Sequence, residues 1–259
     1  MLLQKERQQV REYCIKMFER GLTIGTSGNI SVFNRNEELY AISPSDMDYY
    51  EVKDEDVVIM DINGNVVDGK QRPSSEFRTH QIFYQNREDV NSVIHNHAKA
   101  ATAVSCLYKD VPPIHEMIIV NGGDEIITSP FTKSGGQELA DVVFKTMGER
   151  NGILVGSHGM VTVGADVGEA LFIAEEIISS PQMCIRDRVL KNGVKFNHPY
   201  NDPVKLLFSL VIKDSKSYLN IFNDVLKLST NKDFTHGVIN AKSEKEVYDI
   251  IVKESLKLN

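Results

Sequence analysis

Residues 91–97 read Asn-Ser-Val-Ile-His-Asn-His, and this stretch is the starting point for the fold. The apolar pair Val93-Ile94 predicts a strand over 91–97, and a helix is expected from Ala98 to about Tyr108. Side chains two residues apart in a strand share a face, so His95 and His97 can converge on one ion. A polar strand end without any metal fits the same pair.

Strands and helices alternate on both sides of this segment, which predicts an α/β fold. The turn signal Asn63-Gly64 joins two of the expected strands as a hairpin. Helices are expected over 1–20, 76–85, 134–150 and 165–178, and strands over 30–33, 39–42, 57–60, 66–67 and 153–155.

Two further segments carry residues suited to chemistry. His158 follows the expected strand 153–155 directly before Gly159, where it could enter a site or remain a surface histidine. Ser74-Ser75-Glu76 begins an expected helix, and a capped helix with an acid in its first turn fits equally well. Taken together, three histidines and a carboxylate fit a catalytic zinc site with an exchangeable position. A divalent ion there could polarise a carbonyl and stabilise an enediolate, while the carboxylate moves a proton.

Two segments also suit an anionic ligand. The glycine-rich turn Gly25-Thr-Ser-Gly-Asn29 presents backbone N–H groups, although such turns are usually only turns. Ser74 and Ser75 lie at an expected helix N-terminus, where free amides and the helix dipole favour phosphate.

Five motifs occur in the order and spacing of the class II aldolase/adducin family, which the first 180 residues therefore resemble. Within that family the L-fuculose-phosphate aldolases are most similar. The motifs are Gly25-Thr-Ser-Gly-Asn29, Ser43-Pro-Ser45, Pro73-Ser-Ser-Glu76, His95-Asn-His97 and His158-Gly159.

The resemblance implies a three-layer α/β domain with a central mixed or antiparallel sheet. It implies zinc-dependent cleavage of a ketose 1-phosphate to dihydroxyacetone phosphate and an aldehyde, with one Zn²⁺, or another divalent metal ion, per chain. It also implies a four-fold homotetramer with active sites between subunits. The implied roles are metal ligation by His95, His97 and His158, acid/base catalysis and metal ligation by Glu76, phosphate binding by Asn29, Ser45, Ser74 and Ser75, and shaping of that pocket by Thr26 and Gly28.

Two positions depart from the family pattern. Asp46 stands where a glycine usually faces the phosphate, and its charge would weaken phosphate binding unless it points away. Glu116 replaces a tyrosine that protonates from the neighbouring subunit, and a glutamate can also do acid/base work. His80 and His115 are expected to be structural, on a helix face and a strand.

Glu76 favours an aldolase, since the related pentulose-phosphate epimerases tend to carry aspartate there. A sugar-phosphate epimerase or dehydratase on the same scaffold is the alternative.

Composition narrows the class of protein. The 259 residues carry a net charge of −7, which argues against a nucleic-acid partner. No apolar run approaches the length of about 18 residues that a membrane span needs, and no secretory signal is visible. Cys14, Cys106 and Cys184 form neither a disulfide framework nor a zinc site, so a cytoplasmic location is expected.

The last 79 residues differ from the rest in character. Residues 1–180 carry a charge of 16 − 27 = −11, whereas 181–259 carry 13 − 9 = +4. Pro181 contradicts continuation of the preceding helix. Met183-Cys-Ile-Arg-Asp187 resembles the translation of a transposase adapter used in sequencing libraries, so 181–188 are predicted to be an artefactual junction.

Residues 189–259 resemble a C-terminal fragment of the fructose/mannitol-type enzyme IIA domain of the sugar phosphotransferase system. A strand over 203–212 and helices over 217–228 and 244–256 are expected there. The family's phosphorylated histidine lies upstream of this part, so neither His198 nor His236 is assigned that role. A phosphocarrier or regulatory fusion, and an ordinary α/β extension of the first domain, are the alternatives.

Overall fold

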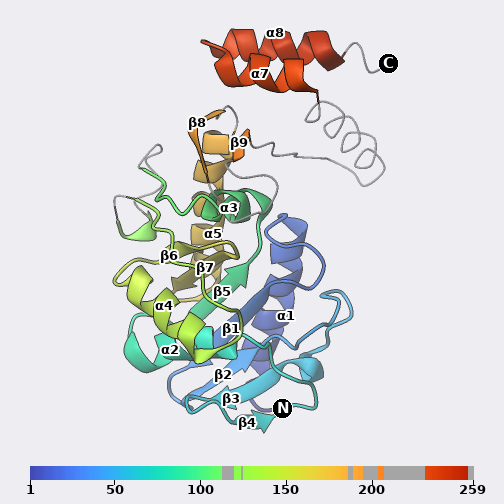
Figure 1. Ribbon diagram of the computed structural model, residues 1–259. Coiled ribbons are helices and arrows are strands. Elements are labelled where there is room, and N and C mark those ends of the chain that lie inside the picture. The colour runs from blue at the N-terminus through green and yellow to red at the C-terminus, as the bar shows by residue number, and fades with distance from the viewer. Residues whose placement is uncertain (113–119, 124, 186–188, 195–203, 207–230, 256–259) are drawn as a thin grey trace. The chain divides into compact units, whose positions relative to one another are not determined.

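A seven-stranded antiparallel sheet forms the centre of the first of two units in the computed structural model (Figure 1). The structure describes residues 1–112, 120–123, 125–185, 189–194, 204–206 and 231–255. The units are Met1–Met183 and Cys184–Asn259. The strand order is β4-β3-β2-β1-β5-β7-β6. The strands are β1 (Asn29–Asn34), β2 (Leu39–Ile42), β3 (Val58–Asp61), β4 (Val66–Asp68), β5 (Ser92–Asn96), β6 (Gly152–Val155) and β7 (Gly159–Gly164).

Helices cover both faces of this sheet, which confirms the three-layer α/β architecture (Figure 1). Helices α2 and α4 pack on the face that carries Phe33, Tyr40 and Val93. Helix α1 contacts β1 and β2 on the opposite face of the sheet. Its Met17 lies against Gly28, which directly precedes β1. The helices of this unit are α1 (Gln4–Glu19), α2 (Phe77–Asn86), α3 (Lys99–Ser105), α4 (Gln137–Met147) and α5 (Val167–Ile185), with a 3₁₀ turn at Asp54–Asp56.

Two differences from the sequence-based expectation bear on the site. Strand β7 was not predicted, and it pairs with both β5 and β6. Helix α2 begins at Phe77 with Glu76 at its cap position, and the Ser74 hydroxyl accepts a hydrogen bond from the Glu76 N–H at 3.3 Å. The serine therefore orders the turn that leads into the helix and helps to hold Glu76 at the N-cap position.

The expectation that Pro181 ends the preceding helix is wrong. Helix α5 runs from Val167 to Ile185 and contains this proline. A proline in a helix interior removes one backbone donor, and here the helix continues for four more residues.

The second unit contains a strand pair and a helix pair. Strand β8 (Val189–Val194) pairs with β9 (Val204–Leu206), and α7 (Lys232–Asn240) contacts α8 (Glu244–Ser255). Helix α8 confirms the helix expected over 244–256, and β9 falls within the strand expected over 203–212. The remainder of that strand and the helix expected over 217–228 lie outside the described residues.

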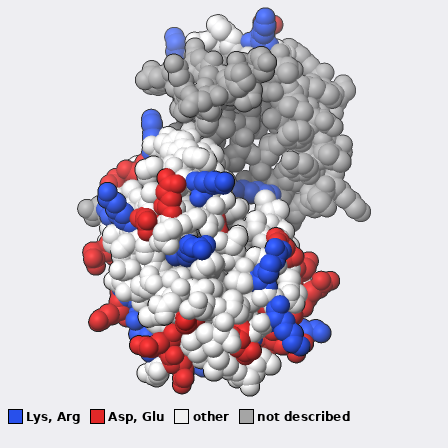
Figure 2. Space-filling model, turned by 60° about the horizontal axis from the view of Figure 1, so that its bottom comes forward, with Lys and Arg blue, Asp and Glu red and all other residues white. Residues whose placement is uncertain are grey.

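Charged side chains of both signs are spread over the visible face of the first unit (Figure 2). Among the described helices, none combines the length and apolar character needed to cross a membrane.

The core between the sheet, α2 and α4 provides a direct test of this packing. Phe83 on α2 is fully buried, and its ring meets Phe144 of α4 edge-on with centroids 5.5 Å apart. Phe83→Ala should lower the free energy of unfolding by about 3–5 kcal/mol, because it removes a buried ring and leaves a cavity. The half-exposed Phe18 on α1 is the control, and Phe18→Ala should cost about 1 kcal/mol. Equal losses for the two variants in urea denaturation would contradict this packing.

Candidate metal centre and its cavity

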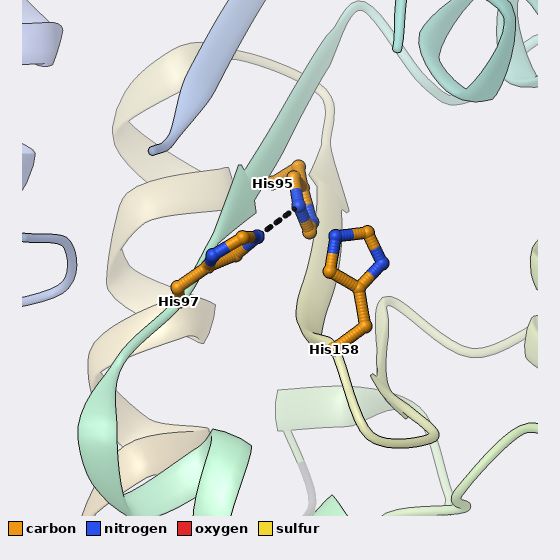
Figure 3. Close-up of side chains that lie close together, drawn as sticks. All are labelled: His95, His97 and His158. Carbon is orange, nitrogen blue, oxygen red and sulfur yellow. Dashed lines mark hydrogen bonds between the residues drawn. The ribbon is translucent and has the colours of Figure 1, made fainter. Parts of the chain in front are cut away.

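Three histidines from two neighbouring strands meet at one end of the sheet (Figure 3). His95 lies near the end of β5, and His97 follows directly after that strand. His158 lies in the turn between β6 and β7, and the pairing of Asn96 with Met160 brings this turn beside β5. One ligand nitrogen from each ring lies within 4.8 Å of the other two. The predicted convergence of His95 and His97 is therefore present, and His158 joins them.

The orientation of His95 is fixed by the neighbouring strand. Its Nδ1–H donates to the carbonyl oxygen of Met160 at 2.9 Å, which directs Nε2 toward the centre of the cluster. The Nε2 atoms of His95 and His97 are 2.9 Å apart. A backbone acceptor on the outer nitrogen is the usual way in which a metal-binding imidazole is oriented.

Glu76 completes the cluster from the N-cap position of α2. One carboxylate oxygen lies 2.9 Å from His95 Nε2, and the other lies 3.4 Å from His158 Nε2. Burial opposes ionisation of Glu76. The charge and hydrogen bond of His95, and the smaller effects of the His158 and His80 charges, outweigh burial and hold the pKa of Glu76 below the usual range. For His95, burial is outweighed by Glu76, so the pKa of His95 is raised. In this structure the two form a buried ion pair.

The donor set fits a divalent ion. Burial is the largest cause that lowers the pKa of His97 to about 4, and burial and His95 also lower the pKa of His158. Both rings are therefore neutral near pH 7, as metal ligands must be. The buried Nδ1 of His158 has no hydrogen-bond partner among the described residues. Imidazole nitrogens and carboxylate oxygens are ligands that divalent transition-metal ions accept.

A cavity of about 330 Å³ opens beside this cluster. It joins segments that are far apart in the sequence, and its lining contains most of the residues that the sequence singled out. His95 is buried behind it, while Glu116 and His115 lie outside the described residues. The lining residues are Thr26, Ser27, Gly28, Asn29, Pro44, Ser45, Asp46, Ser74, Ser75, Glu76, His97, Ser134 and His158.

Sequence reasoning missed Ser134. This exposed hydroxyl precedes Gly135, whose positive φ of 80° turns the chain close to the Ser75 carbonyl. The glycine pair at 135–136 before a helix is the signal that could have indicated it, because glycines often bring a backbone close to a ligand.

Several polar groups in the loops that border the cavity form hydrogen bonds within the protein. The Gly28 N–H donates to the Tyr49 hydroxyl at 2.9 Å, and that hydroxyl donates to the Gly28 carbonyl at 2.7 Å. The Ser45 hydroxyl donates to the Pro73 carbonyl at 2.9 Å. Gly28 and Ser45 therefore fix the shape of the two loops that border the cavity.

Asp46 adopts the left-handed conformation that glycine favours, with φ of 59°. Its carboxylate is 80% exposed and lies 3.5 Å from the Arg72 guanidinium. Such an exposed pair contributes little energy, but it partly balances the negative charge beside the cavity.

Comparison with known proteins gives two family matches. The family described as "Class II Aldolase and Adducin N-terminal domain" matches residues 8–185. The family described as "Phosphoenolpyruvate-dependent sugar phosphotransferase system, EIIA 2" matches residues 177–254.

Individual relatives agree with the first match. A 5-deoxy-D-ribulose 1-phosphate aldolase of Bacillus thuringiensis is 42% identical over 177 residues, 68% of this chain and 83% of the relative. The L-fuculose phosphate aldolase of Escherichia coli K12 is 33% identical over 218 residues, 83% of this chain and 95% of the relative. A solved structure of an L-fuculose 1-phosphate aldolase, 34% identical, superposes with a TM-score of 0.68 and covers 86% of this chain and 96% of its own.

Metal binding should release protons, because His95 must lose the proton that it holds beside Glu76 before it can ligate. Because Glu76 raises the pKa of His95, this ring holds its second proton at a higher pH than a free imidazole does. Titration calorimetry of the metal-free chain with Zn²⁺, in two buffers of different ionisation enthalpy, should show this release. The release should decline, and the affinity should rise, as the pH is raised through the His95 pKa.

The matched control is Glu76→Gln, which removes the charge that raises the His95 pKa and should reduce the number of protons released. Identical heats in the two buffers for the unmodified chain would contradict the protonated state of His95.

Proposed function

This chain belongs to the class II aldolase and adducin family, and on that premise we propose that it is a zinc-dependent aldolase. It would cleave a ketose 1-phosphate similar to fuculose 1-phosphate into dihydroxyacetone phosphate and an aldehyde, through an enediolate. The observation that carries the proposal is the convergence of Glu76, His95, His97 and His158 at one end of a polar cavity. The cavity volume of about 330 Å³ suits a small sugar phosphate.

The metal end is assigned to His95, His97 and His158, with Glu76 as a further ligand before substrate binds. A divalent ion held there supplies Lewis-acid polarisation of the substrate oxygens beside the carbon–carbon bond that breaks. The backbone acceptor at Met160 keeps the His95 ring in the ligating orientation.

The anion end is assigned to Asn29, Ser45, Ser74 and Ser75, which would bind the phosphate, with Thr26 and Gly28 shaping the pocket. All six residues line the cavity. Ser74 and Ser75 lie just before Glu76, the N-cap residue of helix α2, whose dipole favours an anion at this end.

Two proton movements balance the cleavage. The hydroxyl that becomes the aldehyde loses a proton, and the carbon left on the dihydroxyacetone phosphate fragment gains one. Glu76 is assigned the second movement because it is the buried carboxylate beside the histidine cluster. Removal of the hydroxyl proton is assigned to Glu116, and this assignment rests on the sequence alone.

We further propose that the enzyme is a cytoplasmic homotetramer.

We also propose that residues 1–180 form the aldolase domain, residues 181–188 an artefactual junction and residues 189–259 a phosphocarrier-like fragment. The two family matches support two bodies of different origin. Amplification of genomic DNA across codons 175–195 tests the junction, because a continuous product would show that the fusion is natural.

The metal assignment predicts about one zinc per purified chain. His95→Ala and His158→Ala should each remove most of this metal, because each deletes a ligand that no described neighbour replaces. The control is His236→Ala, the same substitution at an exposed position on α7 in the second unit. Unchanged zinc by mass spectrometry in both cluster variants would refute the assignment.

The catalytic assignment predicts that Glu76→Gln lowers kcat by about 10²–10⁴, because the amide fills the same space but transfers no proton. Activity is measured as aldol addition of dihydroxyacetone phosphate to a panel of aldehydes, with zinc content measured in parallel. Full activity of the metal-loaded variant, or no activity of the unmodified chain with any aldehyde, would contradict the proposed function.

A further inference from the structure

A chain of buried hydrogen bonds runs from the core of the first unit to the anion end of the cavity. The Tyr84 hydroxyl lies 2.5 Å from Ser31 Oγ, which lies 2.7 Å from His80 Nδ1. His80 Nε2 lies 2.5 Å from the side-chain oxygen of Asn29, which lines the cavity. Ser31 and His80 are fully buried, and none of these contacts is used by the histidine cluster.

The donor-to-acceptor direction along this series of hydrogen bonds is set by the groups at its two ends. The Asn29 oxygen can only accept, so His80 Nε2 must carry the hydrogen. Burial lowers the pKa of His80 to about 3, so the ring is neutral and its Nδ1 accepts from the Ser31 hydroxyl. Ser31 in turn accepts from Tyr84.

The opposite polarity would leave Tyr84 without an acceptor for its own hydrogen. The Ser31 hydroxyl is the side-chain partner of Tyr84 among the described residues. The backbone of Val93 lowers the pKa of the phenol, whereas a carbonyl that accepted its hydrogen would raise that pKa. A buried hydroxyl without an acceptor is unfavourable, so the Tyr84-to-Asn29 direction is the consistent one.

We propose that His80 is a positioning residue for anion binding, which fixes the Asn29 amide with its NH₂ group toward the cavity. Without the His80 donor, the two ends of the Asn29 amide become interchangeable, and the oxygen can turn toward the ligand and repel an anion. The identification of that anion as the substrate phosphate rests on the proposed function, but anion binding by itself does not require catalysis.

The position of His80 explains why a histidine occurs here. It lies one turn after Glu76, so α2 presents the carboxylate to the histidine cluster and the imidazole to the anion end. Asn29 is paired with His95 across β1 and β5, so its side chain emerges on the same face of the sheet. A leucine could fill this space but could not select one orientation of the Asn29 amide.

The test is binding of inorganic phosphate to the full chain, measured by titration calorimetry. His80→Leu should raise the Kd for phosphate roughly tenfold, because it removes the group that orients a donor to an anion. His80→Gln and His80→Asn form a matched pair. The glutamine nitrogen reaches the position of Nε2 and should restore binding to within about threefold, whereas asparagine reaches only Nδ1 and should behave like leucine.

Asn29→Ala provides the coupling test. It should weaken phosphate binding, and adding His80→Leu to it should cause no further loss, because the imidazole then has no amide to orient. Thermal unfolding and zinc content identify variants that are misfolded, and the glutamine–asparagine comparison decides the matter if the leucine variant is unstable.

Three results would overturn the proposal. These are normal phosphate binding by a folded His80→Asn variant, multiplicative losses of affinity in the double variant, and no phosphate binding by the unmodified chain. Failure of the proposed aldolase function alone would give a different set of results. A chain that cleaves no ketose phosphate, yet binds phosphate with this dependence on His80, would refute the aldolase assignment and retain the positioning role.

Discussion

The antiparallel register between β1 and β5 is the constraint on which the rest of the site depends. Asn29 pairs with His95, and the same register aligns Ser31 with Val93. Because side chains alternate between faces, a slip of one residue would turn either Asn29 or His95 away from α2. Pairing of β5 with β7 then sets the position of His158. One ladder therefore places the proposed anion-binding end and the proposed metal-binding end of the cavity side by side.

Burial of Glu76 among histidines resolves an electrostatic problem that this register creates. A carboxylate that is only 6% exposed is costly unless an opposite charge or a metal compensates it. In the structure His95 supplies that charge. A divalent ion would replace the proton on His95, so the cluster is compensated both with and without metal.

Much of this arrangement could be predicted from the sequence, for identifiable reasons. The strand around 91–97, the hairpin at Asn63-Gly64 and the convergence of His95 with His97 follow from periodicity and turn chemistry, which are local. Strand β7 was not predicted, although its Val161 and Val163 are buried. The turn at 156–158 that precedes it carries His158 and was interpreted as part of the site, not as a connection between two strands. The role of His80 could not be read from its helix position, because its partners Ser31 and Asn29 lie about fifty residues away. Pro181 shows the opposite error, where a strong local rule gave way to a helix that continues through it.

The two ends of the cavity share a helix but respond to different forces. Glu76 interacts through charge, which depends on the protonation and metal content of the cluster. His80, one turn later, is neutral and acts through the direction of a single hydrogen bond. A neutral donor at this position fixes the Asn29 amide without adding a positive charge beside the metal ligands, where it would compete with the ion. A lysine or arginine there would attract phosphate more strongly but would oppose the cation about one helical turn away. An uncharged imidazole at this position thus suits both the proposed cation site and the proposed anion site beside one short helix.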